Sequence, residues 1–594
     1  MLKKLLIASI FFLIITAIIA GASLYFKKQT PALAQTANTY YINATSGNNN
    51  NDGLSEATAW QTINKVNSSN FNPGDSILFK RGEVWRETLT IPSSGNSTNQ
   101  IIFGSYGIGA KPIFIGSEAA TSWTNLGSNI WSSAVSNNPT GIWFMNFNGS
   151  INWCKKESNQ GNLNAEYECY WSTNTLYIYS PSDPDTRYNS VEASTRGYGV
   201  TASSESTSYV TVQDIELRFT NNQGVKVPRY SMGWIVQNVE SHHNGGVSFG
   251  DGSVEIGDSI AVYGSNAMIR NNIVYESGRH CIYSGSTGGQ TITGNIYENN
   301  IIYNCYHNQL DLQNTNGTHE NITVRYNKIY FTNNAVPGHS PSGIFIQGVS
   351  GYIVNGIDIY YNILSYNPNQ GMHISFYSTN INIYNNVIYA SQKTNYGGSL
   401  YLNNGTYSAT VKNNIGMNGE FSALGQVTDS TNKTINYNCW YQTPDKIQRI
   451  AEIAGTRYSD WNTYKNTTGF DANSIWGNDV LFTKADTDLS VANFALQSGS
   501  PCIDAGTNLG LTRDIAGNIV PQGATFDIGA YEYVEAAPPP SLTGDFNSDS
   551  KVNDLDFTSF KNAFKSIFNA IFDLNSDNAI DVKDLGVLMS GWLP

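Results

Sequence analysis

A polar residue followed by an aliphatic one recurs through the middle of the chain. The pairs are Asp214-Ile215, Asn238-Val239, Asn272-Ile273, Asn300-Ile301, Lys328-Ile329, Asn362-Ile363, Asn386-Val387 and Asn414-Ile415. Their aliphatic members are 24, 34, 28, 28, 34, 24 and 28 residues apart. A second series runs in phase with the first, and each member begins a short alternating strand: Val225, Val247, Ile282, Leu310, Ile344, Ile374 and Leu400.

Two short strands per repeat cannot bury an apolar face by themselves, but stacked coils enclose a shared apolar interior. The repeat therefore predicts a parallel β-helix with the second series in one interior column. The Asn residues would then lie above one another at a turn, where each amide can bond to the next.

The ends of the repeat are less regular than its middle. Helical spacing of apolar residues over 58–67 predicts a short helix covering the N-terminal end. The repeat lapses between about 117 and 190, where tryptophans are frequent, and we expect a β-rich insertion there. After Gly416 we expect irregular coils up to Val534.

Several segments resemble pectate-lyase-like β-helix proteins. At the start these are Tyr40–Asn43, Asn51–Gly53, Pro73–Phe79 and Arg81-Gly82, and at the end Ser500–Gly506 and Phe526–Glu532. The resemblance covers most of residues 40–533 and implies an all-β fold, a right-handed parallel β-helix (solenoid). It is specific for fold and weak for reaction, because this fold carries lyases, hydrolases, epimerases and inert surface proteins.

A twelve-residue pattern of oxygen-bearing side chains occurs twice near the C-terminus, 28 residues apart. The first copy has Asp545, Asn547, Asp549, Asn553 and Asp556, and the second has Asp573, Asn575, Asp577, Asp581 and Asp584. Positions 1, 3, 5, 9 and 12 of an EF-hand loop carry such ligands, so we expect calcium as the cofactor here.

The duplicated loops resemble a dockerin, which implies a small α-helical domain and a cohesin-like protein partner. Position 6, usually Gly, is Ser550 in one loop and Asn578 in the other. The recognition positions hold Asp554-Leu555 and Val582-Lys583, which departs from the familiar cellulosome pattern. A calcium-stabilised terminal cap without a partner is the alternative.

These patterns predict seven segments along the chain. They are an export segment (1–34), an N-terminal cap with the first coils (35–116), the Trp-rich β insertion (117–190), the central β-helix (191–430), its C-terminal end (431–535), a Pro-rich linker (536–542) and the dockerin-like domain (543–594). The first segment has Lys3-Lys4 before an apolar run of 22 residues, Leu5 to Phe26, with a small-residue cleavage site at Ala32–Ala34. A cleaved signal peptide and an uncleaved membrane anchor both fit, and either places the remainder outside the cytoplasm.

The net charge of −13 argues against nucleic acid as a partner, since phosphate binding needs a basic surface. Six cysteines show no CxxC spacing. Cys154 and Cys169 flank an expected hairpin, where either a disulfide or buried thiols would fit.

Candidate chemistry lies on the outward side of the second series of strands. The outward stripe is Lys226, Ser248, Tyr283, Asp311, Phe345, Ser375 and Tyr401, at about 4.8 Å per coil. Flanking positions add Gln309, Gln313, Gln347, His373 and Tyr377, and the preceding turns add His242, His243, Arg279, His280 and His307. Aromatic rings beside amides and imidazoles are typical of a sugar-binding groove, although a merely decorated β-helix surface would also carry them.

Two cleavage mechanisms fit these residues. A polysaccharide lyase needs a base and positive charge, for which Lys226, Arg229, Arg279 or His280 would serve, with Asp251, Glu255 or Asp311 holding a metal. A glycoside hydrolase needs two carboxylates, and Asp311 would need a partner from 251–258 or Glu276.

The basic residues near one end of the stripe favour the lyase slightly. Asp311 and His307 are the first candidates for catalysis, followed by Lys226, Arg279 and His280. We expect Tyr283, Phe345, Gln309, Gln313, Gln347, His373 and Tyr401 to bind substrate. The sequence thus predicts an exported enzyme that degrades a polysaccharide. The alternatives are a non-catalytic glycan-binding or adhesion protein and a stiff scaffold element.

Overall fold

The computed structural model describes residues 37–247, 256–332, 341–391 and 398–535, and in the C-terminal module 551–563, 574, 583–584 and 586–587. The chain divides into two compact units, Met1–Glu532 and Tyr533–Pro594. Among the described residues, no helix combines the length and the apolar character needed to cross a membrane. The expected export segment (1–34) lies outside the described residues.

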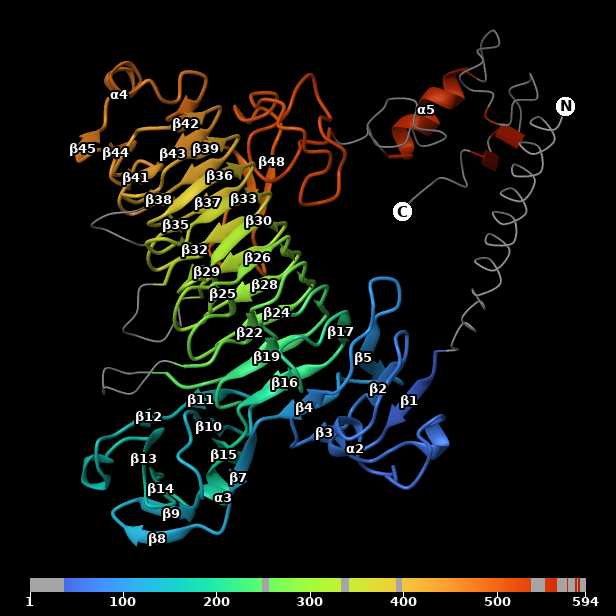
Figure 1. Cartoon of the computed structure of the whole chain (residues 1–594). Helices are drawn as coiled ribbons and strands as arrows, with labels where there is room; N and C mark the ends of the chain where they lie inside the picture. The colour runs from blue at the N-terminus through green and yellow to red at the C-terminus, as the bar shows by residue number, and fades with distance from the viewer. Residues whose placement is uncertain are drawn as a thin grey trace, which may run out of the picture. The chain divides into compact units, whose positions relative to one another are not determined.

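The first unit is a β-helix of three long parallel sheets, shown in Figure 1. Sheet A contains β1 (Thr39–Ile42), β2 (Ser76–Lys80), β5 (Ile101–Tyr106), β17 (Val210–Gln213), β20 (Ile235–Gln237), β23 (Met268–Arg270), β27 (Ile296–Glu298), β30 (Thr318–Arg325), β33 (Val354–Tyr360), β36 (Ser378–Tyr384), β39 (Ala409–Lys412) and β42 (Lys433–Asn436), with β26 (Thr291–Thr293) paired to β30.

Sheet B contains β3 (Val84–Trp85), β6 (Ile113–Ile115), β18 (Glu216–Arg218), β21 (Glu240–His242), β24 (Ile273–Tyr275), β28 (Ile301–Tyr303), β31 (Lys328–Tyr330), β34 (Ile363–Ser365), β37 (Val387–Tyr389), β40 (Ile415–Met417), β43 (Cys439–Tyr441) and β46 (Ile475–Trp476).

Sheet C contains β4 (Leu89–Ile91), β16 (Tyr198–Ala202), β19 (Gln223–Val227), β22 (Ile260–Val262), β25 (Ile282–Ser286), β29 (Leu310–Asn314), β32 (Ile344–Gln347), β35 (Met372–Ile374), β38 (Leu400–Leu402), β41 (Gly425–Val427), β44 (Ala451–Ile453) and the antiparallel β45 (Thr456–Tyr458). Each coil runs from sheet A through sheet B to sheet C.

The interior column predicted from the second series is confirmed in sheet C. Val225, Ile282, Leu310, Ile344 and Leu400 are at most 1% exposed and belong to one ladder of paired residues. Two members were assigned wrongly. Ile260 replaces Val247, which precedes β22, and Met372 replaces Ile374, which pairs two residues further along β35.

A ladder of asparagines lies at the turn between sheets A and B, as predicted. The amide nitrogens of Asn272, Asn300, Asn327, Asn362, Asn386 and Asn414 each donate to the side-chain oxygen of the ladder residue in the next coil, up to Asn438. Asn327 and not Lys328 holds the ladder position, because Lys328 pairs with Ile301. In the two earlier coils Ile215 and Val239 occupy that position, one residue after Asp214 and Asn238.

The ends differ in detail from the expected pattern. The N-terminal cover is a single 3-10 turn, η1 (Glu56–Thr58), and a short helix, α2 (Ile63–Asn67), because Trp60 bridges to Ile42 and Thr62 caps α2. Regular rungs continue past the expected limit at Gly416 to β46, and the irregular segment that we expected up to Val534 begins only after Trp476. Beyond them lie α4 (Trp461–Thr468), β47 (Phe482–Lys484) and β48 (Asn493–Leu496).

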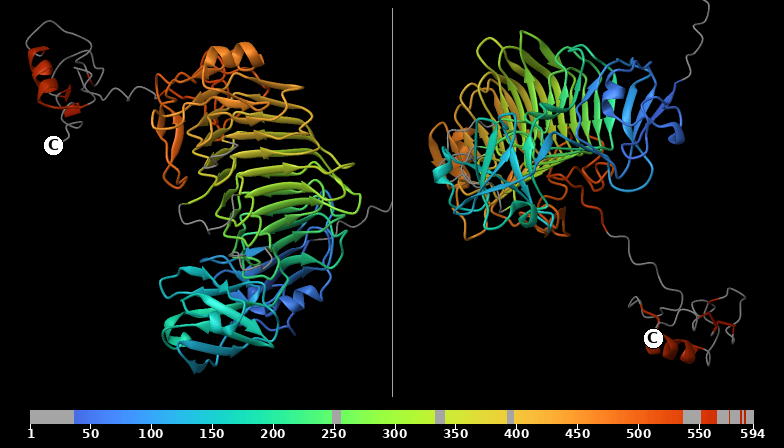
Figure 2. Two further views of the ribbon diagram at one scale, coloured as in Figure 1. Left: turned by 90° about the vertical axis from the view of Figure 1, so that its left-hand side faces the viewer. Right: turned by 90° about the horizontal axis from the view of Figure 1, so that it is seen from below.

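Residues 117–194 form two smaller sheets beside the N-terminal coils (Figure 2). Their elements are β7 (Ser117–Ala120), β8 (Thr124–Gly127), β9 (Ile130–Ala134), β10 (Ile142–Met145), β11 (Ile151–Trp153), β12 (Lys155–Lys156), η2 (Gln160–Asn162), β13 (Glu168–Ser172), β14 (Thr175–Tyr179), α3 (Pro184–Arg187) and β15 (Ser190–Ser194). Their pairing is antiparallel except for β12 with β13. The insertion has its own apolar core.

All six cysteines form disulfides: Cys154–Cys169, Cys281–Cys305 and Cys439–Cys502. The first joins Cys154, between β11 and β12, to β13 of the insertion, in agreement with one of the two alternatives for this pair. The second joins neighbouring coils at the turn between sheets B and C, and the third fastens the returning C-terminal segment to β43. Neither of the two later pairs could be inferred from the spacing of cysteines in the sequence, because these cysteines meet only when the coils stack.

The second unit contains α5 (Asp554–Ala563). The Asn553 side-chain oxygen accepts from the Leu555 backbone N–H, and an Asp556 carboxylate oxygen accepts from the Asn553 N–H. These reciprocal bonds satisfy donors at the start of the helix. The Pro-rich linker (536–542) lies outside the described residues.

Candidate functional site

The outward stripe of sheet C follows the strand register. Its consecutive residues are Lys226, Ala261, Tyr283, Asp311, Phe345, His373, Tyr401 and Gln426. The assignments of Ser248 and Ser375 to this stripe were wrong. Ala261 and His373 take those rungs, because β22 and β35 begin at Ile260 and Met372, and Ser248 itself lies outside the described residues.

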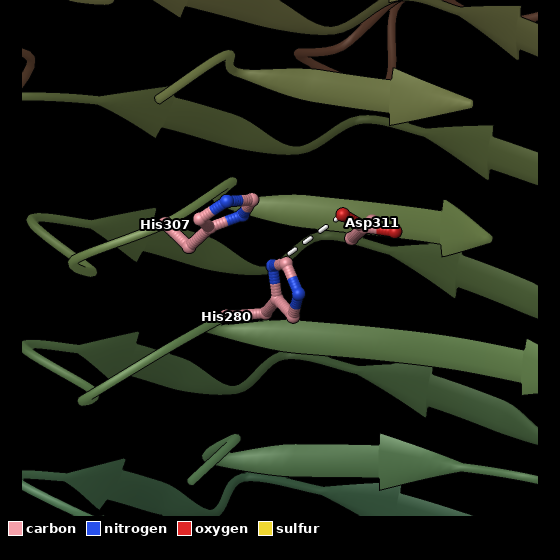
Figure 3. A group of neighbouring side chains, drawn as sticks. All are labelled: His280, His307 and Asp311. Atoms are coloured by element: carbon pink, nitrogen blue, oxygen red, sulfur yellow. Dashed lines mark ion pairs between the residues drawn. The ribbon is translucent and has the colours of Figure 1, made fainter. Parts of the chain in front are cut away.

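Three side chains meet where the turns from sheet B enter sheet C (Figure 3). The Asp311 Oδ2 lies 3.4 Å from the His280 Nδ1, and both side chains are only 1% exposed. The His307 ring stands edge-on to the His280 ring, with centroids 4.8 Å apart. His280 precedes β25 and His307 precedes β29, so two successive coils bring them to one strand end.

Burial controls the electrostatics of this cluster. It raises the pKa of Asp311 from 3.8 to about 7, against the opposing effects of the Asn308 hydrogen bond and the Arg279 charge. The Asn308 Nδ2 donates to the Asp311 Oδ2 at 2.8 Å, whereas the Oδ1 has no hydrogen-bond partner among the described residues. Burial lowers the pKa of His280 well below its usual value, so His280 is neutral at pH 7. Asp311 is therefore a carboxyl group that exchanges a proton near neutral pH.

A second buried acid, Asp258, lies close enough to interact electrostatically with Asp311. Burial raises the pKa of Asp258 to about 6, and the charge of Arg279 opposes this. Its side chain is held by the backbone N–H of His280, which donates to Oδ1 at 3.4 Å. The sequence had offered 251–258 as one source of a second carboxylate. Asp251 and Glu255, also in that segment, lie outside the described residues.

A pocket of about 320 Å³ opens beside Asp311 on the side of the later coils. It is lined by His307, Asn308, Asp311, Gln313, Pro341, Ser342, Phe345, Gln347, Asn369 and His373. Burial lowers the pKa of His373 to about 4, so this ring is also neutral at pH 7. Five predicted substrate-binding or catalytic residues therefore share one pocket with Asp311: His307, Gln313, Phe345, Gln347 and His373. Asn308, Ser342 and Asn369 were missed, because they lie in turns without a repeating signal.

Other predicted residues are placed elsewhere. Gln309 is fully buried, and its amide accepts from the Cys305 N–H and donates to the carbonyls of Cys305 and His307, so it supports the turn and cannot face a ligand. Lys226 forms an ion pair with Glu205 at 2.6 Å. It lies three rungs from Asp311, which is about 14 Å.

The basic end of the stripe is not an open cationic surface. Arg279 lies over the Tyr283 ring, 5.5 Å from its centroid, and does not line the pocket. Tyr283 is 5% exposed and stacks on His280. Tyr401 is half-buried on the far side of His373, with their rings 4.7 Å apart.

The expected gathering of five histidines was wrong for two of them. His242 and His243 lie at sheet B, where their Nδ1 atoms are 2.7 Å apart. His242 faces Glu216 and His243 faces Glu276, so Glu276 is not a partner for Asp311. The Trp153 ring of the insertion stacks on His243, which gives this pair a packing role.

Calcium does not fit the donors of the pocket cluster. Atoms of His280, His307 and Asp311 lie within 4.8 Å of one another. Calcium takes about 6–8 oxygen ligands, whereas this trio offers two imidazoles and one carboxylate. The Asp311 Oδ2 already contacts Asn308 and His280, and we interpret the trio as a proton-exchanging cluster.

Calcium fits the C-terminal loops better. Of the ten predicted ligands, Asn553, Asp556 and Asp584 are described, and Asp545, Asn547, Asp549, Asp573, Asn575, Asp577 and Asp581 lie outside the described residues. Asp556 and Asp584, both at position 12, are fully buried. Fully buried carboxylates need compensating charge, and their oxygens are the donors that calcium prefers.

Comparison with known families covers both units. The model of the right-handed β-helix region matches residues 258–440, and that of the dockerin type I domain matches residues 543–590. The lacto-N-biosidase of Bifidobacterium longum subsp. longum is 33% identical over 84 residues, which are 14% of this chain and 5% of that protein. The chain thus spans only a small part of this relative.

Solved structures share the fold at low identity. The complex of XylC with xylose is 13% identical, with a TM-score of 0.55, over 84% of this chain and 98% of that one. The pectate lyase Pel9A is 15% identical, with a TM-score of 0.45, over 84% of this chain and 97% of that one. The chain therefore contains a right-handed parallel β-helix, followed by a dockerin type I domain.

Proposed function

We propose that the protein is a glycan-cleaving enzyme in which Asp311 acts as an acid in hydrolysis. The observation that carries this proposal is a buried carboxyl group with a pKa of about 7 in the wall of a polar and aromatic pocket. A catalytic acid works best when its pKa lies near the working pH, and glycosidases use a carboxyl group raised in this way.

Among the described residues that line the pocket, Asp311 is the only carboxylate. Hydrolysis needs one acid to protonate the glycosidic oxygen and one base to take a proton from the attacking water. Asp258 precedes β22, two coils before Asp311 with the Tyr283 coil between them, and it does not line the pocket, so it acts on Asp311 only through its charge. We propose that His307, which lines the pocket beside Asp311, takes the proton from the attacking water.

Hydrolysis explains the surroundings of Asp311 better than the lyase reaction that the sequence slightly favoured. A lyase stabilises a carbanion beside a uronate carboxylate with positive charge, often from calcium. Among the described lining residues there is no Lys or Arg. His373, whose pKa burial lowers, is neutral at pH 7. The similarity to XylC in complex with xylose supports a sugar ligand only through the shared fold.

The dockerin domain supports a tethered, extracellular role. We propose that it binds calcium through both loops and docks onto a cohesin-like partner outside the cell. Asp554-Leu555 and Val582-Lys583 stand at the positions where dockerins carry recognition residues, and this difference favours a partner other than the familiar cellulosome scaffold.

A polysaccharide panel tests the proposed reaction. The purified full chain is incubated with neutral and uronate-containing polysaccharides, with and without chelator, while reducing ends and ultraviolet-absorbing double bonds are followed. We expect new reducing ends without double bonds. Asp311→Asn should lower kcat/KM by about 10²-fold or more, the usual contribution of an acid catalyst.

Asp358→Asn is the matched control, because Asp358 is an exposed carboxylate on sheet A of the same β-helix. Its kcat/KM should equal that of the parent chain. Double bonds in the products would identify a lyase and overturn the proposal. Glycan binding without turnover, unchanged in Asp311→Asn, would instead identify a non-catalytic glycan-binding protein.

A further inference from the structure

The outward stripe of sheet C is open on only one side of Asp311. Towards the N-terminus, Ala261 is fully buried and Tyr283 is 5% exposed. Towards the C-terminus, Phe345, His373 and Tyr401 are each half-buried, and the first two line the pocket. The predicted groove is therefore closed immediately before Asp311 and accessible after it.

Tyr283 forms the closed end. Its ring stacks on His280, with centroids 5.4 Å apart and planes 15° apart, and the Tyr263 ring meets it edge-on at 5.9 Å. A Cβ added to Gly285 would collide with the Tyr283 ring, so the ring lies along its own strand over this glycine. The Arg279 guanidinium also lies over the ring, 5.5 Å from its centroid. This packing leaves no room for a glycan chain to continue past Tyr283.

The pocket is also small, and the residues described in its lining include no Lys or Arg. Its volume of about 320 Å³ lies at the lower end of the ~300–1,000 Å³ typical of small-ligand sites. Planar amides of Gln313 and Gln347 and the Phe345 ring suit the hydroxyls and apolar faces of sugars. A uronate carboxylate would meet Asp311 without a described cation in the lining to balance it.

We infer that the pocket takes the terminal residues of an uncharged glycan and cleaves from the chain end. This inference rests on the proposed function and adds the substrate class and the mode of attack. The terminal sugar lies between the Tyr283 wall and Phe345. The rest of the glycan leaves the pocket past His373 and Tyr401. Tyr401 lies three rungs, or about 14 Å, from Asp311.

Viscosity measured together with reducing ends tests the mode of attack. Soluble neutral polymers (arabinoxylan, mixed-linkage glucan and galactomannan) are compared with polygalacturonate. Cleavage from chain ends releases many reducing ends with little loss of viscosity, and the same short product should dominate from the first minutes. We expect this pattern on a neutral polymer and no cleavage of polygalacturonate.

Two tyrosines of the stripe make a matched pair of variants. Tyr283→Ala removes the wall and should increase the viscosity loss per bond cleaved several-fold, with longer early products. Tyr401→Ala removes a ring from the open side and should raise KM for long chains while the product stays the same. Tyr283→Phe keeps the ring and should restore the short early product, and thermal unfolding of each variant shows whether it is folded.

The outcomes separate the two proposals. Rapid viscosity loss by the parent chain, or preference for polygalacturonate, would overturn the chain-end inference while leaving a glycan-cleaving enzyme in place. If the parent chain cleaved none of the polymers and none of their oligosaccharides, the proposed function would fail and the inference with it.

Discussion

Replacing the buried acid Asp311 by Asn should stabilise the protein relative to the parent, and this stabilisation should grow as the pH rises. The pKa of Asp311 is about 7 in the folded protein, against 3.8 for an ordinary aspartate. At neutral to alkaline pH the Asp311 carboxylate is therefore charged and buried in the folded protein. The same charge costs less free energy in the unfolded chain, where water solvates it. At 1.36 kcal/mol per pKa unit, the difference of roughly three units corresponds to about 4 kcal/mol.

The sign of this effect depends on protonation in both states. Below about pH 4 the carboxyl group is protonated whether the chain is folded or unfolded, and its ionisation contributes nothing to stability. Stability then falls as the pH rises from about 4 to about 7, because only the unfolded chain ionises freely in that range. Asn carries no charge at any pH and can still accept from Asn308. Asp311→Asn should therefore match the parent at pH 4 and exceed it at pH 8.

Thermal unfolding at a series of pH values measures the difference. For about 500 ordered residues, an unfolding entropy of about 1 kcal/mol per degree converts 4 kcal/mol into a Tm higher by about 4 °C at pH 8. Asp358→Asn, an exposed carboxylate on sheet A, should show no such trend. A Tm difference between Asp311→Asn and the parent that stays constant from pH 4 to pH 8 would refute the reasoning, because it would show that Asp311 does not change its charge there.

Two further predictions concern the ladder and the C-terminal loops. Asn362→Ala should lower the unfolding free energy by about 3 kcal/mol or more in denaturant titration, because Asn327 loses its acceptor and the carbonyls of Val324 and Tyr360 lose their donor. Asn404→Ala, at an exposed position, should stay within about 0.5 kcal/mol of the parent, and equal losses in both variants would contradict a special role for the ladder. Removing calcium with a chelator should unfold α5 and lower the helical circular dichroism while β-sheet signals persist, since binding at about 100-fold above Kd contributes about 2.7 kcal/mol. An unchanged helix signal with calcium absent would exclude calcium as the stabilising ligand of this unit.

The sequence alone determined the coil and its interior. Alternation of apolar residues and the recurring Asn report local geometry, since both depend only on period and turn conformation. The column through Val225, Ile282 and Leu400 and the ladder from Asn272 to Asn414 were therefore predictable. The same holds for the dockerin domain, because each of the two oxygen-rich patterns that identify it lies within twelve residues.

The assignment of individual rungs needed the tertiary structure. Val247 and Ile374 fit the alternating pattern as well as Ile260 and Met372 do, but excursions between sheets B and C shift the start of a strand. Such a shift moves the outward residue, which is why His373 and not Ser375 stands beside Phe345. Periodicity cannot measure the length of a turn that carries no repeating residue.

The chemistry of the site was decided by contacts between coils. The sequence brought forward Asp311 and His307, but only the stacked turns place His280 against Asp311 and hold Asp258 within electrostatic reach. Burial then sets which carboxyl keeps its proton, encloses Gln309 and turns Tyr283 into a wall. A pKa and a closed end both depend on what surrounds a side chain in space, and residues 22 to 53 positions apart supply those surroundings here.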